Sequence, residues 1–593
     1  MKVFDITYLD KDLNRESLKK AWDTLHLLSA MQGLANRNGA QLYYLYKSLR
    51  GGKPGSLDRF WLDKMTEEGA FLAKEPIVQI PSFNSLLEEF ISVFDGIVLY
   101  DGNVPATSCV ATTIAGVENL APVRYDPDPG SVYSMLTKKL NVKKRLLNAD
   151  GSPMFTGKGI IPGTCRPSTG SAKCDAYIWA KMKYLDKGLC SKEFMGYYID
   201  YAFTGLTKSP SLNLATLTNI DFQVMHKGFV FDLGVWDDEA VIDDPEQEPG
   251  LDLATFKELL LSQYLQSGGN MVQISGFTPW NMKYTRTAGA MGQHGDVDTE
   301  WRHAELLSNY NCYMDADAIG SSDMTNASVF CQCPLRERYE TPKSDLEDLK
   351  RMGAIDEDGQ VKKTNFVSIY VGDYDSAAWL YQNMPRIWES PKRGAVPLGW
   401  ALNPNLSLRF AFGMDYFRRT ATVNDTFVAG DNGAGYLNPG ALSEPRRFSG
   451  LPSGVEKWRE HNKKWFDIFD LSCVGFVIDG FAPKMTDELL ELYADIAPDG
   501  IGGQLLPSKW GVYDKLPYIV MEDGQDPARY KEVCRNLKRG EVTFTMLRNI
   551  LWMPEAQEEY MANVTREMEG DVMFLEPYAF FRLMKYFIKG EAE

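Results

Sequence analysis

Apolar residues recur at spacings of three and four near the start of the chain, which is the pattern of an amphipathic helix. They are Leu18, Trp22, Leu25, Leu28 and Met31. Gly33 and Gly39 interrupt the pattern, and the run Gln41–Tyr46 then predicts a strand. The chain therefore opens with a helix followed by a strand.

Strands followed by helices recur further along the chain. Ile97–Tyr100 is a short apolar run, and Pro105–Gly116 after it predicts a helix. Gly228–Leu233 predicts another strand, a helix is expected around Leu253–Leu265, and Met271–Ile274 predicts the next strand. This alternation is typical of α/β proteins.

The last third of the chain contains several apolar, β-branched runs, each of which ends close to an acid. The runs and their acids are Phe366–Val371 with Asp373 and Asp375, Phe427–Ala429 with Asp431, Val474–Ile478 with Asp479, Tyr518–Met521 with Glu522 and Asp523, and Val572–Leu575 with Glu576. Helical patterns separate them. We therefore predict an α/β fold in which a distorted, TIM-like (β/α) barrel follows smaller amino-terminal α/β domains. In such barrels the ligand lies at the carboxyl ends of the strands.

Shifts in composition divide the chain into four segments, in keeping with its 593 residues. We assign an α/β domain to 1–92, a second small α/β domain with a Pro-, Gly- and Lys-rich connector to 93–175, and a third α/β domain to 176–334. The barrel-like catalytic domain is assigned to 335–593, after a charged, turn-rich boundary.

Charge and hydropathy exclude several classes of partner. The net charge of −17 argues against a general nucleic-acid binder, which needs a cationic surface. No apolar run approaches the ~18 residues of a membrane span. No apolar signal segment is visible in the first residues, which favours a cytoplasmic location over a processed secreted form.

The sequence lacks several motifs of cofactor and nucleophile chemistry. It has nine cysteines and five histidines, without zinc-site spacing, HExxH, a phosphate loop or GxSxG. No cofactor is therefore expected, and carboxylates are the candidates for chemistry. We predict catalytic acids among Asp373, Asp375, Asp431, Asp479 and Glu576.

Two close carboxylates, such as Asp373 and Asp375, can share a proton or hold a cation. Glycoside cleavage also needs two carboxyl groups, one protonated and one ionised. Each single acid could instead cap a helix or close a turn. Aromatic and polar residues expected to bind a sugar are Trp280, Trp379, Arg393, Trp400, Asn403, Tyr436 and Asn438.

The glycine-rich stretch 430–440 carries a family resemblance. Gly433-Ala434-Gly435-Tyr436-Leu437-Asn438-Pro439 resembles the motif of the GxGYxYP glycoside hydrolase family, with Asn438 in place of the second tyrosine of the motif. Further segments similar to the family are 31–37, 100–116, 276–284 and 372–375. The resemblance implies a hydrolase that acts on a carbohydrate substrate.

Three functions remain open from the sequence. The first is a glycoside hydrolase that uses paired carboxylates at strand ends. The second is a metal-dependent carbohydrate deacetylase or phosphoesterase, with Asp373 and Asp375 as ligands. The third is a glycan-binding protein without catalysis, in which the acids only cap and pair.

Overall fold

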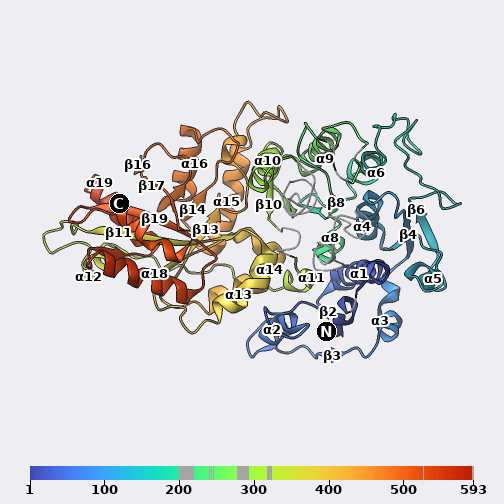
Figure 1. Ribbon diagram of the computed structural model, residues 1–593, viewed down its shortest axis with the longest axis horizontal. Helices are drawn as coiled ribbons and strands as arrows, with labels where there is room; N and C mark the ends of the chain where they lie inside the picture. The colour runs from blue at the N-terminus through green and yellow to red at the C-terminus, as the bar shows by residue number, and fades with distance from the viewer. Residues whose placement is uncertain are drawn as a thin grey trace. The chain divides into compact units, whose positions relative to one another are not determined.

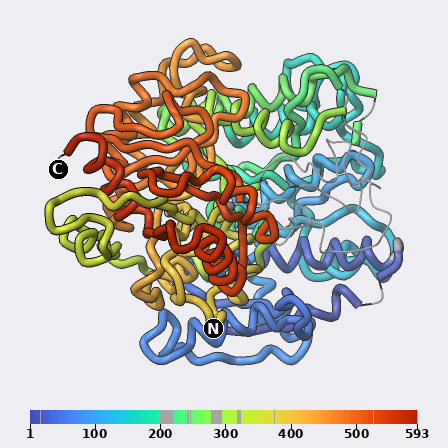
Figure 2. The backbone as a smooth tube through the Cα atoms, turned by 60° about the vertical axis from the view of Figure 1, so that its left-hand side comes forward, coloured from blue at the N-terminus to red at the C-terminus, as the bar shows by residue number. Residues whose placement is uncertain are grey.

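The computed structural model describes most of the chain, as two compact units (Figures 1 and 2). The described residues are 1–11, 13–198, 219–239, 241, 243–244, 246–276, 293–316, 323–524 and 526–590. Unit 1 consists of Met1–Pro334 with the later segments Ala377–Gln382 and Leu408–Phe412. Unit 2 consists of Leu335–Ser376, Asn383–Ser407 and Gly413–Glu593.

The described part of unit 1 contains three small sheets whose neighbouring strands are all parallel. The first has the order β2-β1-β3, with β1 (Lys2–Asp5), β2 (Leu42–Leu45) and β3 (Val78–Gln79). The second has the order β5-β4-β6, with β4 (Gly96–Tyr100), β5 (Leu120–Arg124) and β6 (Val142–Arg145). The third has the order β10-β9-β7-β8, with β7 (Phe194–Tyr197), β8 (Phe229–Phe231), β9 (Val272–Ser275) and β10 (Cys312–Asp315). Each sheet lies in one of the three amino-terminal segments that we assigned.

Helices pack around these sheets. They are α1 (Arg15–Ala35), α2 (Ser56–Thr66), α3 (Phe83–Phe90), α4 (Ala106–Glu118), α5 (Val132–Leu136), α6 (Ala172–Ala180), α8 (Ile220–His226), α9 (Leu251–Ser267), α10 (Asp296–Ser308) and α11 (Ala327–Phe330). The helix predicted from the apolar spacing near the amino terminus is α1, and it packs against α8 and α4. At Gly33 a Cβ atom would lie 2.9 Å from Cβ of Val224, so glycine permits the close approach of α1 and α8.

Buried polar contacts join the segments Ala377–Gln382 and Leu408–Phe412 to the rest of unit 1. Arg409 donates to Asp315 at 2.9 Å, and both side chains are fully buried. Asp315 also accepts the backbone N–H of Ala377 at 2.9 Å. Tyr381 lies in the same segment as Ala377, and its hydroxyl donates to Asp58 at 2.5 Å. These charge-assisted bonds explain why the two segments belong to unit 1.

Unit 2 is built on a ten-stranded sheet. The strands are β11 (Asn365–Tyr374), β12 (Leu398–Leu402), β13 (Asp425–Asp431), β14 (Cys473–Val477), β15 (Gly500–Gly503), β16 (Trp510–Tyr513), β17 (Leu516–Val520), β18 (Glu522–Asp523), β19 (Thr543–Ile550) and β20 (Val572–Phe574). Their order is β16-β17-β15-β14-β13-β12-β11-β19-β18, and β20 pairs with the start of β11. All neighbours are parallel except β16 and β17, so the carboxyl ends of the parallel strands share one edge.

The helices of unit 2 connect and cover these strands (Figure 1). They are α12 (Leu346–Arg351), α13 (Ala377–Trp388), α14 (Ser407–Arg419), α15 (Val455–Phe469), α16 (Asp487–Ile496), α17 (Tyr530–Asn536), α18 (Pro554–Glu567) and α19 (Pro577–Lys589), of which α13 and α14 each give a few residues to unit 1. Strand and helix alternate from β11 to β15, and the apolar runs predicted three of these five strands: β11, β13 and β14. The α/β class is therefore confirmed.

The closed barrel that we expected is not confirmed, because the strand order has two ends. The sheet is nevertheless strongly curled. The guanidinium of Arg548 on β19 lies 4.5 Å from the ring centroid of Phe476 on β14, although three strands separate β19 from β14 in the sheet. In addition, only Met521 separates β17, which pairs with β15, from β18, which pairs with β19. The result is a half-barrel with a concave inner face.

Within the described residues, none of the helices combines the length and apolarity that crossing a bilayer requires.

Candidate functional site

The candidate site lies at the carboxyl edge of the unit 2 sheet. Asp431 is the last residue of β13, Asn403 follows β12, and Asp479 lies two residues beyond the end of β14. Because β12, β13 and β14 are adjacent and parallel, these three side chains come from neighbouring strand ends. The structure thus brings together residues that are up to 76 positions apart in the sequence.

Asn403 holds the backbone of Asp431 in place. Its side-chain oxygen accepts the N–H of Asp431 at 3.0 Å, and its amide donates to the carbonyl of Asp431 at 3.4 Å. Asn403 is fully buried, so it is satisfied by this backbone rather than by a ligand. We predicted a sugar contact at Asn403, and the structure gives it the role of positioning Asp431 instead.

The carboxylate of Asp431 is bound by a side chain from another strand of the sheet. It accepts a hydrogen bond from the hydroxyl of Tyr370 on β11 at 3.3 Å. The Tyr370 ring crosses the face of the sheet over Gly475, where a Cβ atom would collide with it, and lies 6.2 Å from the Phe476 ring. A side chain at position 475 would therefore displace the ring that orients Asp431.

Asp479 differs from the other acids in its surroundings. Its Oδ2 accepts the N–H of Leu505 at 3.2 Å, and its own N–H donates to Gln504 at 3.0 Å. Its Oδ1 is buried and has no hydrogen-bond partner among the described residues. Burial raises the pKa of Asp479 from 3.8 to about 6, against smaller lowering effects of the Leu505 N–H and the Lys484 charge. A carboxylic acid with this pKa holds a proton in mildly acidic solution.

The glycine-rich loop frames Asp479 by binding the residue before it. Asn432 accepts the N–H of Ile478 at 2.7 Å, and the amide of Asn438 donates to the carbonyl of Ile478 at 3.1 Å. Asn432 has a positive φ of 67°, a conformation that asparagine tolerates better than most residues. Asn438 was predicted to contact a sugar, but its amide fastens the loop to the end of β14.

Helix α15 packs against the same loop and forms hydrogen bonds to it. Asn462 accepts the N–H of Ala434 at 2.8 Å, and His461 contacts the Ala434 carbonyl at 2.8 Å. Gly433 has φ of 126°, and a Cβ atom there would collide with the Asn462 side chain. Burial lowers the pKa of His461 to about 4, so this ring is neutral and its Nε2 donates to the carbonyl.

Arg393 and Trp400 have a structural role that the sequence analysis did not foresee. Arg393 pairs with Asp425 at 2.5 Å and donates to two backbone carbonyls, those of Trp388 at 2.7 Å and Thr420 at 3.0 Å. The indole of Trp400 is fully buried and donates to the same Asp425 at 2.8 Å. Asp425 is the first residue of β13, so both side chains stabilise the amino end of that strand and not the carboxyl edge.

Glu576 lies away from the other acids. Its strand β20 pairs with Asn365–Val367, the first residues of β11, and not with the carboxyl end. The carboxylate accepts the N–H groups of Tyr578 and Ala579, both at 2.7 Å, and thereby caps α19. The expectation that it meets the other acids is wrong, because the short strand β20 ends near the amino edge of the sheet.

The remaining predicted residues have simpler outcomes. Asp373 lies in β11, but its side chain is outside the described part of the structure, and Trp280 is outside the described residues altogether. Asp375 directly follows β11 and is partly exposed. Trp379 is a partly exposed residue of α13, and Tyr436 is buried within the glycine-rich loop. Their proposed roles stay predictions.

Sequence reasoning missed three residues of the site: Tyr370, Asn432 and Gln504. Tyr370 is an aromatic in an apolar strand and gave no signal of a polar contact. Gln504 directly follows β15, a strand of sequence Gly-Ile-Gly-Gly that apolar periodicity does not reveal. The position of Gln504 directly after a glycine-rich run was the sequence feature that could have indicated a site residue.

No group of three or more His, Cys, Asp or Glu side chains that could hold a metal ion occurs among the residues that the structure describes. Because the Asp373 side chain is not described, the metal-dependent alternative stays a prediction.

Comparison with protein families identifies the chain. Residues 363–509 match the "GxGYxYP putative glycoside hydrolase C-terminal domain", which contains β11 to β15 and the glycine-rich loop. Residues 14–92 match the first amino-terminal domain of the same family. The chain belongs to the GxGYxYP family. The resemblance that the loop sequence indicated is thus confirmed.

One solved structure resembles the GxGYxYP protein along nearly its whole length. It is the "Crystal structure of a putative hydrolase from Bacteroides thetaiotaomicron VPI-5482 at 1.25 A resolution", with 14% identity and a TM-score of 0.63. The match covers 98% of this chain and 94% of that chain. At this identity the likeness supports the fold alone. The comparison with curated proteins produced no match.

Proposed function

We propose that this protein is a glycoside hydrolase whose proton donor is Asp479. The observation that carries the proposal is the state of this side chain: it is buried at a strand end, has a pKa raised to about 6, and keeps one oxygen without a hydrogen-bond partner among the described residues. A general acid must be protonated near its working pH and must have an oxygen available for the leaving group. The family name and the hydrolase-like fold agree with this chemistry.

The second carboxylate comes from another strand end. Asp431 is one candidate, because its carboxylate accepts a hydrogen bond from Tyr370, and such a bond favours the ionised form that a base or nucleophile needs. Asp373 and Asp375 at the end of β11 are the alternatives. Glu576 is not proposed, because both of its oxygens cap α19.

The test is a glycan screen with the wild-type protein, Asp479→Asn and Asp431→Asn. We expect wild-type turnover whose kcat/KM falls as the pH rises through about 6, because the donor loses its proton. Asp479→Asn should lower kcat about 100-fold or more. Wild-type turnover that survives Asp479→Asn with an unchanged pH profile contradicts the assignment.

Glu576→Gln is the matched control, since it changes a buried carboxyl at the other edge of the sheet. It should lower stability and leave kcat/KM of the folded protein unchanged. Glycan binding without turnover in the wild type would instead favour a binding protein. Activity that disappears with EDTA and returns with added metal would favour the metal-dependent alternative.

A further inference from the structure

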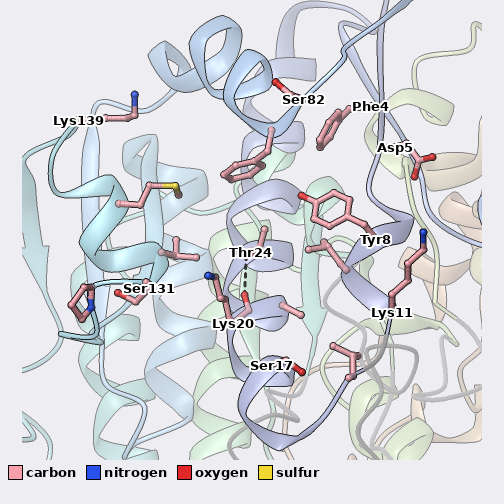
Figure 3. A pocket seen from close by; sticks show the side chains of 18 of the residues that line it. Phe4, Asp5, Tyr8, Lys11, Ser17, Lys20, Thr24, Ser82, Ser131 and Lys139 are labelled. Atoms are coloured by element: carbon pink, nitrogen blue, oxygen red, sulfur yellow. Dashed lines mark hydrogen bonds between the residues drawn. The ribbon is translucent and has the colours of Figure 1, made fainter.

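Unit 1 contains a pocket of about 800 Å³ that the proposed chemistry does not use (Figure 3). It lies between the first half of α1, the strand β1 with the turn after it, the start of α3, and the segment 129–139 around α5. Its volume is in the range of sites for small organic molecules.

Apolar side chains from all of these elements line the pocket. Among them are Phe4, Leu9, Ala21, Phe83, Val132 and Tyr8. Phe4, Leu9, Ala21 and Val132 are buried and form the floor, while Tyr8 is 43% exposed. In Figure 3 the Tyr8 hydroxyl points toward the middle of the pocket. An aromatic residue that remains so exposed above an apolar floor is a surface that a ligand can cover.

Four lysines lie around this apolar floor: Lys11, Lys20, Lys138 and Lys139. None of the four takes part in an ion pair within the described chain. The one acid among the described residues of the lining is Asp5, whose Oδ1 accepts the N–H and the hydroxyl of Thr7 at 2.9 and 2.7 Å, so the lysines of the lining outnumber its acids by four to one. In a protein with a net charge of −17, this local excess of cations is unusual.

We propose that this pocket binds a small apolar carboxylic acid, with its alkyl or aromatic body over the floor and its carboxylate at the lysines. The apolar lining disfavours a free sugar or an inorganic anion, which could not use it. The lysine rim disfavours a neutral hydrocarbon. The concave shape and limited volume favour a single small molecule over a membrane surface. This ligand would be separate from the carbohydrate substrate.

The test uses the full-length protein and decanoate as the probe, measured by titration calorimetry. We expect saturable binding with one site per chain, weakened by added salt because the lysines are exposed. Decanol, which has the same chain without the charge, should bind more weakly. Absence of decanoate binding up to millimolar concentration overturns the proposal.

Variants then separate the pocket from adventitious binding. Replacing Lys20 and Lys138 together by Gln should weaken decanoate binding about two- to tenfold and leave decanol binding unchanged. Replacing Lys74 and Lys158 by Gln removes two exposed lysines outside the pocket and should change neither. If the two double variants weaken decanoate binding equally, the proposal is contradicted.

Ala21→Trp fills the floor from α1 and should abolish the binding of both probes. Because this variant can fold poorly, its circular dichroism and glycan turnover are compared with those of the wild type, and the lysine pair provides an independent test. Binding to phosphatidylserine vesicles that survives Ala21→Trp would overturn the proposal in favour of a membrane surface.

Discussion

The side-chain oxygen of Asn403 occupies the space next to Gly430 that a Cβ atom would fill. The same oxygen accepts the N–H of Asp431, the next residue along β13. Gly430 on β13 and Asn403 after β12 therefore act together to fix the carboxyl end of β13. The Asn403 side chain can take this position only because residue 430 has no Cβ atom.

Gly430→Ala should lower the free energy of unfolding by about 1–3 kcal/mol, because the new methyl group collides with Asn403 and would lie 2.9 Å from the Ala401 carbonyl. Urea unfolding measures the loss. Gly503→Ala in β15 is the control, since its new methyl group would lie no closer than 3.3 Å to the Leu506 side chain and 3.4 Å to Cβ of Val477. Equal losses for the two variants would contradict the steric explanation.

Asp479→Asn should change how stability depends on pH. The folded-state pKa of about 6 lies above the ordinary 3.8, so the folded protein holds this proton more tightly than the unfolded chain. Stability from this group is complete below about pH 4 and is lost as the pH rises to about 6, a change of about 3 kcal/mol. The Asn variant lacks this change.

The measurement is the free energy of unfolding at pH 4 and pH 7 for both proteins. Other buried acids with raised pKa values, such as Asp23 and Asp221, contribute equally to both proteins and cancel in the comparison. An identical pH dependence would show that Asp479 is solvated and ionised in the folded protein.

Asn438→Tyr, which restores the second tyrosine of the family motif, should destabilise this protein. Asn438 is fully buried and binds the Ile478 carbonyl, so a phenol ring overpacks the loop and costs about 1–3 kcal/mol. Asn438→Ala should cost about 1 kcal/mol through the lost hydrogen bond. A rise in Tm for Asn438→Tyr would show that the loop has room for the ring.

Arg393→Met should lower stability by about 3 kcal/mol, because it leaves the buried Asp425 carboxylate without its charge partner. Glycan affinity of the folded protein should not change, since Arg393 lies at the amino end of β13. Lys392→Met removes the neighbouring exposed Lys392–Glu558 pair and should cost less than 1 kcal/mol. A large loss of glycan affinity in Arg393→Met would restore the sugar-binding role.

Asp58→Asn should be strongly destabilising, by about 2 kcal/mol or more. Its carboxylate receives four donors: Tyr381 and Asn326 bond one oxygen, and the N–H groups of Tyr46 and Lys47 bond the other at 2.6 Å. An amide group places its own hydrogens against donors. Asp63→Asn on the exposed side of α2 is the control, and thermal unfolding compares the two.

Much of the fold follows from local patterns in the sequence. The spacing of Trp22, Leu25 and Leu28 predicts α1, and the apolar runs before Asp431 and Asp479 predict β13 and β14. These predictions hold because helical and extended periodicity depend on neighbours in the chain. Strands β12, β15 and β19 were not predicted, because the prediction followed continuous apolar runs, and glycine or polar residues interrupt all three strands.

The sequence by itself determined the α/β class, the family motif and a set of acids that follow apolar runs. Only the tertiary structure decided which acids share an edge: Asp431 and Asp479 do, whereas Glu576 follows a strand that pairs with the opposite end of β11. It also decided that Arg393 and Trp400 serve Asp425. The reason is physical, because strand order, register and burial depend on contacts between distant residues, and these contacts leave no local period in the chain.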